Sequence, residues 1–488
     1  MRFRTAPVLA ALLLVAAGCG GGGGGGNALP AAADVVPASA PVLISIKTDF
    51  ASPQWGHALA LVHKFPGAGD LLRQAQLEAG NVDFEHDVKP ALGPEVDIVW
   101  LDFANGGNDV VGLTQPKSKQ KFAALIAKEN KTGTKALTTE VGDWTVVADA
   151  RAKLDSFRRA SSGDKLAKAA AFKDALSHLD ENAIVRAYVS GPAVQQQLDG
   201  ALQRSGAPAH LTRGLARMES ISGAGFAEGN GVRAEAALAT QPAATPKAYS
   251  PSLADSLPSG ALFYLSTGDL AAPTRAILKL VARSRPNFER QLGQVESVVG
   301  LTLDKDIYPL ISHEQAVAVY PAMPIPKIVV LVKVPDQNRA EEVVGRILQI
   351  AELGGLNVET LQVGAVRVRE VSQGGSRVHG FVAVTGGKLI FTTARDLLPA
   401  LIQGKGPKLA DDPRYRGARS EAEVPGKVVA MAYGDLARGL PFAFRLAEAN
   451  GSVVPLEARP NTRPLKESLL YATQDGNRFR VSGFLGIK

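Results

Sequence analysis

The sequence predicts an α+β fold built from two tandem homologous domains, each a mixed, largely antiparallel sheet with helices packed on one face. Three observations lead to this prediction. The same order of sequence patterns occurs twice along the chain, strand and helix periodicities mix within each copy, and each copy closes on a hairpin pattern. With 45% hydrophobic and 21% charged residues among 488, the chain can bury a sizeable core in each copy.

The N-terminal residues predict export. Arg2 and Arg4 precede an apolar stretch from Val8 to Ala17, and small residues lead up to Cys19, the only cysteine of the chain. A basic start, a short apolar segment and a small-residue cleavage site are the parts of a secretory signal. The apolar stretch has ten residues, whereas a span of the bilayer needs about 20.

The stretch around Cys19 resembles a bacterial lipoprotein signal, in which the chain is cut just before the cysteine. The resemblance implies cleavage between Gly18 and Cys19, a diacylglycerol thioether on Cys19, and attachment to the extracytoplasmic side of the bacterial cell membrane. Ala16 stands where the usual pattern has leucine, and the alternative is an ordinary secreted protein with a free thiol. Residues 1–18 are thus expected to be a signal peptide, and residues 19–40, rich in Gly, Ala and Pro, a lipidated flexible tether.

The two copies open alike. "PVLISIKTDF" and "GALFYLSTGDL" predict strands that end at Asp49 and Asp269, and an amphipathic helix pattern follows each strand. "VDFEHDVKPALGPEVDIVW" and "LTLDKDIYPLISHEQAVAVY" then predict a short helix and a strand, with Asp87 matching Asp306 at an offset of 219 residues. The apolar positions that share a helix face are Ala58, Leu61, Val62 and Phe65 in the first copy, and Ile277, Leu280 and Val281, then Phe288, Leu292, Val295 and Val299, in the second.

The two copies also close alike. Each last segment predicts a hairpin, which turns at Gly229-Asn230 in the first copy and at Gly476-Asn477 in the second. The offset grows along the chain, and most of the extra residues of the second copy lie around "VGAVRVREVSQGGSRVHGFVAV", which predicts an added hairpin. The proline-punctuated residues 241–252 predict a linker between a first domain, residues 41–240, and a second domain, residues 253–488.

The tandem pattern resembles the bacterial family known as domain of unknown function 3352. The segments that carry the resemblance are "PVLISIKTD", the helix "FASPQWGHALALVHKFPG" and "DFEHDVKPALGPEVDIVW". The family implies an exported envelope protein of bacteria. It supplies no established activity and no catalytic residues.

The densest polar cluster is Asp83, Glu85, His86 and Asp87, which carries groups that bind metal ions. In the second copy, Lys305 stands where the first has His86, so a metal site shared by both copies is not expected. Acidic residues in the first turn of a helix are favoured by the helix dipole. We therefore expect helix capping here, with metal binding as the weaker alternative.

Reactive motifs give no clear chemistry. The sequence has no G-x-S-x-G elbow, P-loop or G-x-G-x-x-G motif. "HEQAV" at His313 lacks the second histidine of a zinc-protease motif. The repeated aspartates Asp49/Asp269 and Asp87/Asp306 are expected to end strands and cap helices, and acid–base catalysis by them is the alternative.

Charge and cysteine content narrow the functions further. The formal net charge of +7 falls to +5 without Arg2 and Arg4, and no dense basic stripe is interleaved with aromatics, so nucleic acid is not an expected partner. One cysteine excludes an internal disulfide, and no metal or other cofactor is expected. Three hypotheses stay open: a membrane-anchored, non-enzymatic lipoprotein that binds or scaffolds an envelope protein or polymer, which the sequence favours; a carrier or sensor of a small or apolar ligand; and an envelope hydrolase. The oligomeric state is open.

Overall fold

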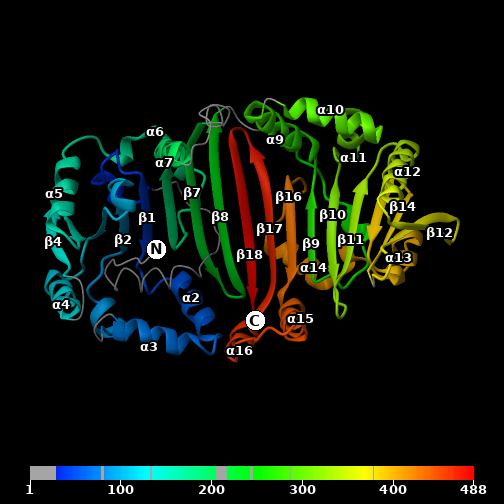
Figure 1. Ribbon diagram of the computed structural model, residues 1–488. Coiled ribbons are helices and arrows are strands. Elements are labelled where there is room, and N and C mark those ends of the chain that lie inside the picture. Colours follow the sequence, from blue (N-terminus) through cyan, green and yellow to red (C-terminus); the bar gives the residue numbers. More distant parts are fainter. Residues whose placement is uncertain are drawn as a thin grey trace.

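The structure, a computed structural model, describes residues 29–78, 82–131, 135–204, 217–241, 246–285, 287–376 and 378–488. Within these ranges, 18 strands form one continuous, curved sheet (Figure 1). Its spatial order is β4-β5-β3-β2-β1-β6-β7-β8-β18-β17-β16-β9-β10-β11-β15-β14-β13-β12, and the ladders between these strands are antiparallel. The predicted α+β class and largely antiparallel sheet are therefore confirmed.

The strand order in one half mirrors the order in the other. β1 lies between β2 and β6, and its counterpart β9 lies between β10 and β16. The second half adds the hairpin β12–β13, which overlaps the insertion expected from the sequence. The strands of the first half are β1 (Val42–Lys47), β2 (Glu95–Trp100), β3 (Val110–Thr114), β4 (Leu137–Val141), β5 (Trp144–Ala148), β6 (Val185–Ser190), β7 (Arg217–Glu228) and β8 (Gly231–Gln241). Those of the second half are β9 (Phe263–Thr267), β10 (Gln315–Tyr320), β11 (Lys327–Lys333), β12 (Asn357–Val363), β13 (Val366–Ser372), β14 (His379–Thr385), β15 (Lys388–Thr392), β16 (Ala430–Asp435), β17 (Leu465–Asp475) and β18 (Arg478–Ile487).

The two closing hairpins meet at the centre of the sheet. β7 and β8 turn at Gly229-Asn230, and β17 and β18 turn at Gly476-Asn477, as the sequence predicts. β8 then pairs with β18 along nine residue pairs, from Gly231 to Ala239. The two repeats thus share one sheet, and their division into separate domains stays a prediction.

Helices lie against both faces of the sheet, whereas the sequence analysis expected one. In β1, Leu43 points into a core with α5 and α6, and Ile46 points into a core with α2 and α4 on the opposite face. We call the face of Leu43 the outer face and the face of Ile46 the inner face. A strand such as "VLISIK", apolar on both faces, is stable only when both faces are covered. The helices of the first half are α2 (Pro53–His63), α3 (Ala68–Glu78), α4 (Lys119–Glu129), α5 (Arg151–Ala160), α6 (Ala170–Leu176) and α7 (Gly191–Arg204); those of the second half are α9 (Ala271–Ser284), α10 (Phe288–Val299), α11 (Tyr308–Leu310), α12 (Gln337–Leu353), α13 (Leu398–Gln403), α14 (Pro413–Glu421), α15 (Leu436–Ala449) and α16 (Ala458–Thr462).

Residues 31–40, expected as part of the flexible tether, belong to the folded body. They include the 3-10 helix η1 (Ala31–Asp34), and Ala32 and Val36 are fully buried in the outer-face core of the first half. The backbone N–H of Ala32 donates to Glu95 Oε1 at 3.2 Å. The sequence analysis missed this packing because small residues without a helix or strand period leave no pattern to recognise.

Candidate functional site: an open apolar hollow

A row of apolar side chains crosses six adjacent strands on the inner face of the second half. Residues paired directly across antiparallel strands point to the same face. Such pairs connect Phe391 on β15 with Leu470 on β17 through β11, β10, β9 and β16. The full row is Phe391, Val330, Val317, Leu265, Ala432 and Leu470.

The two ends of this row are exposed to solvent, and the four residues between them are half-buried. Leu470 is 52% exposed and Phe391 37% exposed, and on the same face Phe263 is 40% and Ile328 37% exposed. The residue next to Leu470 in sequence, Leu469, points to the outer face and is fully buried. A contiguous exposed apolar surface across several strands marks a binding surface more often than an ordinary protein exterior.

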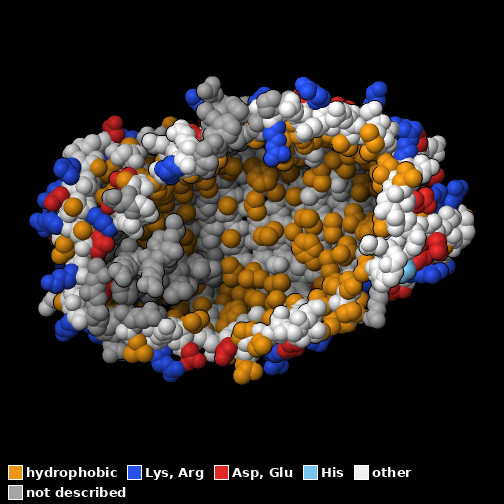
Figure 2. Space-filling model, in the orientation of Figure 1, with side chains coloured by type: hydrophobic (Ala, Val, Ile, Leu, Met, Phe, Trp, Pro, Cys, Tyr) orange, Lys and Arg blue, Asp and Glu red, His pale blue; other side chains and the backbone are white. Residues whose placement is uncertain are grey.

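The open row forms the floor of a hollow. Figure 2 shows the inner face as a broad depression with a largely hydrophobic floor, which lies over β18, β17, β16, β9, β10 and β11 when compared with Figure 1. α9 and α10 run along its upper rim in this view, and α15 and α16 lie at its lower rim. Concave, mostly apolar surfaces of this kind are the usual shape of ligand sites in proteins.

α2 covers part of the inner face in the first half, and its counterpart α9 does not do so in the second. α2 buries Trp55, Ala58 and Leu61 against the sheet, and Trp55 Nε1 donates to the backbone oxygen of Lys47 at 2.8 Å. Among the described side chains of α9, only Ala271 is buried. The hollow therefore exists because α9 stands off the sheet where α2 lies on it.

A single residue difference accounts for much of this asymmetry. When α2 and α9 are aligned on Pro53 and Pro273, Arg275 stands at the position of Trp55. The Arg275 guanidinium lies 4.2 Å from the ring centroid of Tyr308 and 3.4 Å from Asp304, with its side chain 46% exposed. A charged side chain does not enter an apolar interface without a partner, so α9 cannot pack as α2 does.

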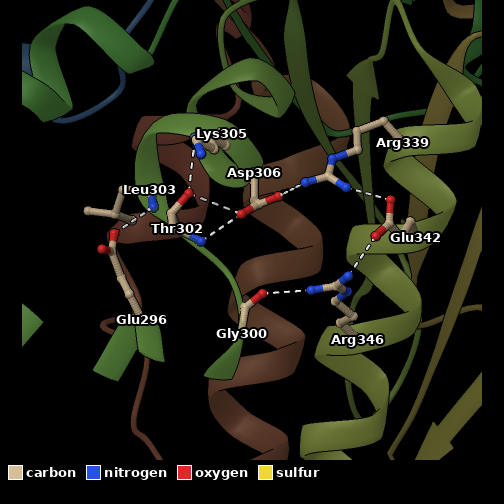
Figure 3. A network of polar contacts seen from close by, with 9 residues as sticks. All are labelled: Glu296, Gly300, Thr302, Leu303, Lys305, Asp306, Arg339, Glu342 and Arg346. Atoms are coloured by element: carbon tan, nitrogen blue, oxygen red, sulfur yellow. Dashed lines mark hydrogen bonds and ion pairs between the residues drawn. The ribbon is translucent and has the colours of Figure 1, made fainter. Parts of the chain in front are cut away.

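A polar network holds the far end of α10 to α12 (Figure 3). Glu296 accepts a hydrogen bond from the backbone N–H of Leu303 at 2.7 Å, and Arg346 donates to the backbone oxygen of Gly300 at 2.7 Å. Arg339 on α12 pairs with both Asp306 and Glu342, and Glu342 also pairs with Arg346. The network fixes where α10 leaves the rim of the hollow.

The repeated aspartates Asp87 and Asp306 have the same structural task in both halves. The backbone N–H of Thr302 donates to Asp306 at 2.6 Å, and that of Asp83 donates to Asp87 at 2.7 Å. Each aspartate also pairs with a cation on the next long helix, Lys128 on α4 for Asp87 and Arg339 on α12 for Asp306. The backbone donor of Thr302 and the nearby Arg339 charge hold the pKa of Asp306 below its ordinary value, as the Lys128 ammonium and the Asp83 N–H do for Asp87.

The other aspartates singled out in the sequence also end or begin local elements. Asp49 accepts from the N–H of Ala51, and Asp269 accepts from the N–H groups of Ala271 and Ala272. Asp83 accepts from the N–H of His86 at 2.7 Å at the start of the short helix that follows. The capping interpretation is therefore confirmed for Asp83 and Asp269, whereas Ser52, and not Asp49, caps α2.

The metal-binding and zinc-protease alternatives both require several metal-ligating side chains close together. Within the described ranges, no group of three or more His, Cys, Asp or Glu residues is placed to hold a metal ion. Nδ1 of His86 lies 2.8 Å from Asp83 Oδ1, and Nδ1 of His313 lies 2.9 Å from the hydroxyl of Ser312. Gly18 and Cys19, the predicted cleavage and lipidation residues, lie outside the described residues.

A buried carboxyl group lies in the first half and was not identified from the sequence. Asp97 on β2 is fully buried on the outer face, paired across the ladder with Ser45, which in turn pairs with Arg186 on β6. Burial, together with the charge of Glu95, raises the pKa of Asp97 well above its ordinary value, and the Arg186 charge offsets part of the effect. The alternation of "EVDIVW" places Asp97 in the core, so a count of strand periodicity could have found it.

The family model described as "Protein of unknown function (DUF3352)" matches residues 111–428. This chain belongs to that family. The match confirms the family resemblance seen in the sequence and assigns no activity to the DUF3352 chain. No curated protein matches it.

Solved structures of TP0453 resemble the DUF3352 chain weakly. Crystal form IV has 13% identity and a TM-score of 0.26, covering 46% of this chain and 76% of that one. Crystal form III has 11% identity, a TM-score of 0.25 and coverages of 48% and 93%, and form I has 14%, 0.25, 48% and 78%. TM-scores this low give no information on function or ligand.

Proposed function

We propose that this DUF3352 protein is a non-enzymatic binding protein that holds an elongated apolar molecule, of the class of lipid acyl chains, along the inner face of its sheet. The observation that carries the proposal is the unbroken apolar row from Phe391 to Leu470, which has exposed ends and no fully buried member. Of the three hypotheses that the sequence left open, this row favours the carrier, because a scaffold has no need of an uncovered apolar floor.

The dimensions of the row suit such a ligand. Six strands are separated by five spacings of about 4.8 Å, which gives a row of about 24 Å. The hydrocarbon layer of one leaflet is about 15 Å deep, half of the bilayer core. An acyl chain can thus lie extended along the row, and each buried methylene contributes about 0.8 kcal/mol to binding.

The sequence supports a location where such molecules occur. The basic start, the apolar segment and Cys19 are typical of an exported lipoprotein, and a chain held at a membrane meets lipids as its nearest apolar molecules. Separately, none of the helices in the described ranges combines the length and apolar character that a membrane span requires.

The test is a titration of the full chain carrying Cys19→Ser with a fluorescent fatty acid, followed by competition with palmitate. The expected result is saturable binding that Leu265→Asn with Val317→Asn weakens by about ten-fold or more, since two apolar contacts are replaced by polar groups. The control changes Leu71 and Leu77 to Asn; these leucines are 64% and 61% exposed on α3, away from the row. Absence of saturable binding, or equal loss in both variants, contradicts the proposal.

A further inference from the structure

We propose that α9 and α10, residues 271–299, bind an anionic lipid surface, so that the open side of the hollow faces a membrane. We call these residues the arm. The arm is the stretch of the second half that corresponds to α2 and α3 in the first. The contact with lipid stands independently of any ligand, whereas a transfer of ligand between membrane and hollow rests on the proposed function.

Several apolar side chains of the arm are exposed to solvent. Ile277 is 61% exposed on α9, and Val295 and Val298 are 58% and 88% exposed on α10. Among the described side chains of the arm, Ala271 alone is buried. Helices with an exposed apolar side and a charged side insert at the boundary between lipid headgroups and acyl chains.

The charge of the arm fits an anionic partner. Residues 271–299 contain five Lys and Arg residues against two Glu residues. Lys279, Arg283 and Arg285 are exposed and take part in none of the ion pairs found within the described ranges. Exposed cations without a protein partner, on helices that also expose apolar groups, are the pattern that binds anionic lipids.

The corresponding stretch of the first half, residues 53–78, lacks this excess of cations, because it contains Lys64 and Arg73 against Asp70 and Glu78. Its helix α3 exposes Leu71 and Leu77 to a similar degree, and Asp70 pairs with Arg73. Exposed apolar groups therefore occur in both halves, whereas the excess of cations occurs in the arm. This difference selects an anionic surface for the arm and makes α3 a control within the same chain.

The arm is held at both ends and lies at the rim. At its start, Asp269 accepts from the N–H groups of Ala271 and Ala272 at 2.8 and 3.2 Å. At its end, the network of Figure 3 joins Glu296 and Gly300 to the residues that follow and to α12. Between these points it runs along the upper rim of the hollow in Figures 1 and 2, so a surface that binds it faces the opening.

The experiment is co-sedimentation of the full chain carrying Cys19→Ser, which removes any lipid on that residue, with vesicles. Vesicles of phosphatidylcholine mixed with phosphatidylglycerol are compared with vesicles of phosphatidylcholine alone. We expect binding to the anionic vesicles, weakened by salt. Changing Lys279, Arg283 and Arg285 to Gln is expected to lower the affinity about 100-fold, at about five-fold for each cation removed, and by more in low salt.

Two controls make the result specific. Changing Lys117, Lys121 and Lys131 to Gln removes the same charge from exposed positions in and beside α4, and changing Leu71 and Leu77 to Ser removes exposed apolar groups from α3. Both controls are expected to bind anionic vesicles as the parent does. Absence of vesicle binding, equal loss in the arm and α4 variants, or binding to soluble polyglutamate without binding to vesicles overturns the membrane proposal.

Failure of this proposal can be told apart from failure of the proposed function. The arm variant with three Gln residues is expected to retain its affinity for the fluorescent fatty acid, because the row on the inner face is unchanged. If the chain binds vesicles through the arm but does not bind the fatty acid, the membrane contact is supported and the carrier function is contradicted.

Discussion

Leu469 and Leu470 are neighbours on β17 that face opposite sides of the sheet, and they offer a direct comparison of the two faces. Leu469 is fully buried in the outer-face core with Phe484, and Leu470 is 52% exposed on the floor of the hollow. The same substitution, Leu to Ala, therefore removes the same atoms from a packed core in one variant and from an open surface in the other.

The expected losses of stability differ clearly. Leu469→Ala leaves a cavity in a close-packed core, which costs about 2–5 kcal/mol. Full burial of a leucine contributes about 1.5–3 kcal/mol, and about half of the Leu470 side chain is already in water, so Leu470→Ala is expected to cost about 1 kcal/mol. The difference reflects how each face is covered, since residue type, strand and backbone position are matched.

Urea unfolding followed by far-ultraviolet circular dichroism is the suitable assay, because the three tryptophans, at positions 55, 100 and 144, all lie in the first half. Equal m-values in the two variants confirm that the same transition is compared. If Leu470→Ala loses as much free energy of unfolding as Leu469→Ala, the inner face of the second half is a packed core and the hollow does not exist in solution.

Four further outcomes are expected. Trp55→Ala lowers the free energy of unfolding in urea by about 3–5 kcal/mol. Arg275→Ala, at the matching position of α9, lowers it far less, and equal losses in the two variants contradict the explanation of why the hollow is open. Asp306→Ala lowers the free energy of unfolding by about 1–2 kcal/mol, because the backbone N–H of Thr302 loses its acceptor. The folded pKa of Asp306 is depressed, so this loss of stability shrinks as pH falls through that pKa. A loss that does not change at acid pH is inconsistent with a charged cap. The folded pKa of Asp97 is raised, so its contribution to stability is present below its unfolded pKa and is lost as pH rises through its folded pKa. Asp97→Asn removes this dependence, and parallel curves of unfolding free energy against pH for parent and variant refute it. Cys19→Ser makes the protein removable from the membrane fraction by a high-salt wash, which also releases a contact made by the charges of the arm, and retention after that wash disproves the lipid anchor.

The parts of the fold that repeat were accessible from the sequence. The Gly-Asn turns, the aspartates that end strands and the added hairpin each leave a local signal, because a turn or cap depends on residues a few positions apart. The packing of residues 31–40 left none, since its partners lie far along the chain, such as Glu95, which accepts from the N–H of Ala32, and Lys165, which bridges to Pro37.

The hollow could be predicted only in part. Strands such as "QAVAVY" and "FYLST" are apolar on both faces, which predicts burial on both faces and not an open floor. The change from Trp55 to Arg275 between the repeats is a visible signal that α9 packs differently from α2. It becomes interpretable once the structure shows that Trp55 fixes α2 to the inner face.

The most direct test of the central claim is photo-crosslinking of the full chain carrying Cys19→Ser with a fatty acid that bears a diazirine along its acyl chain, with the modified residues mapped by mass spectrometry. The account predicts modification on the inner face of β9, β10 and β17, at and around Leu265, Val317 and Leu470, and competition by unlabelled palmitate. Labels that fall mainly on exposed leucines elsewhere, such as Leu71 and Leu77 of α3, or that palmitate does not displace, would contradict it.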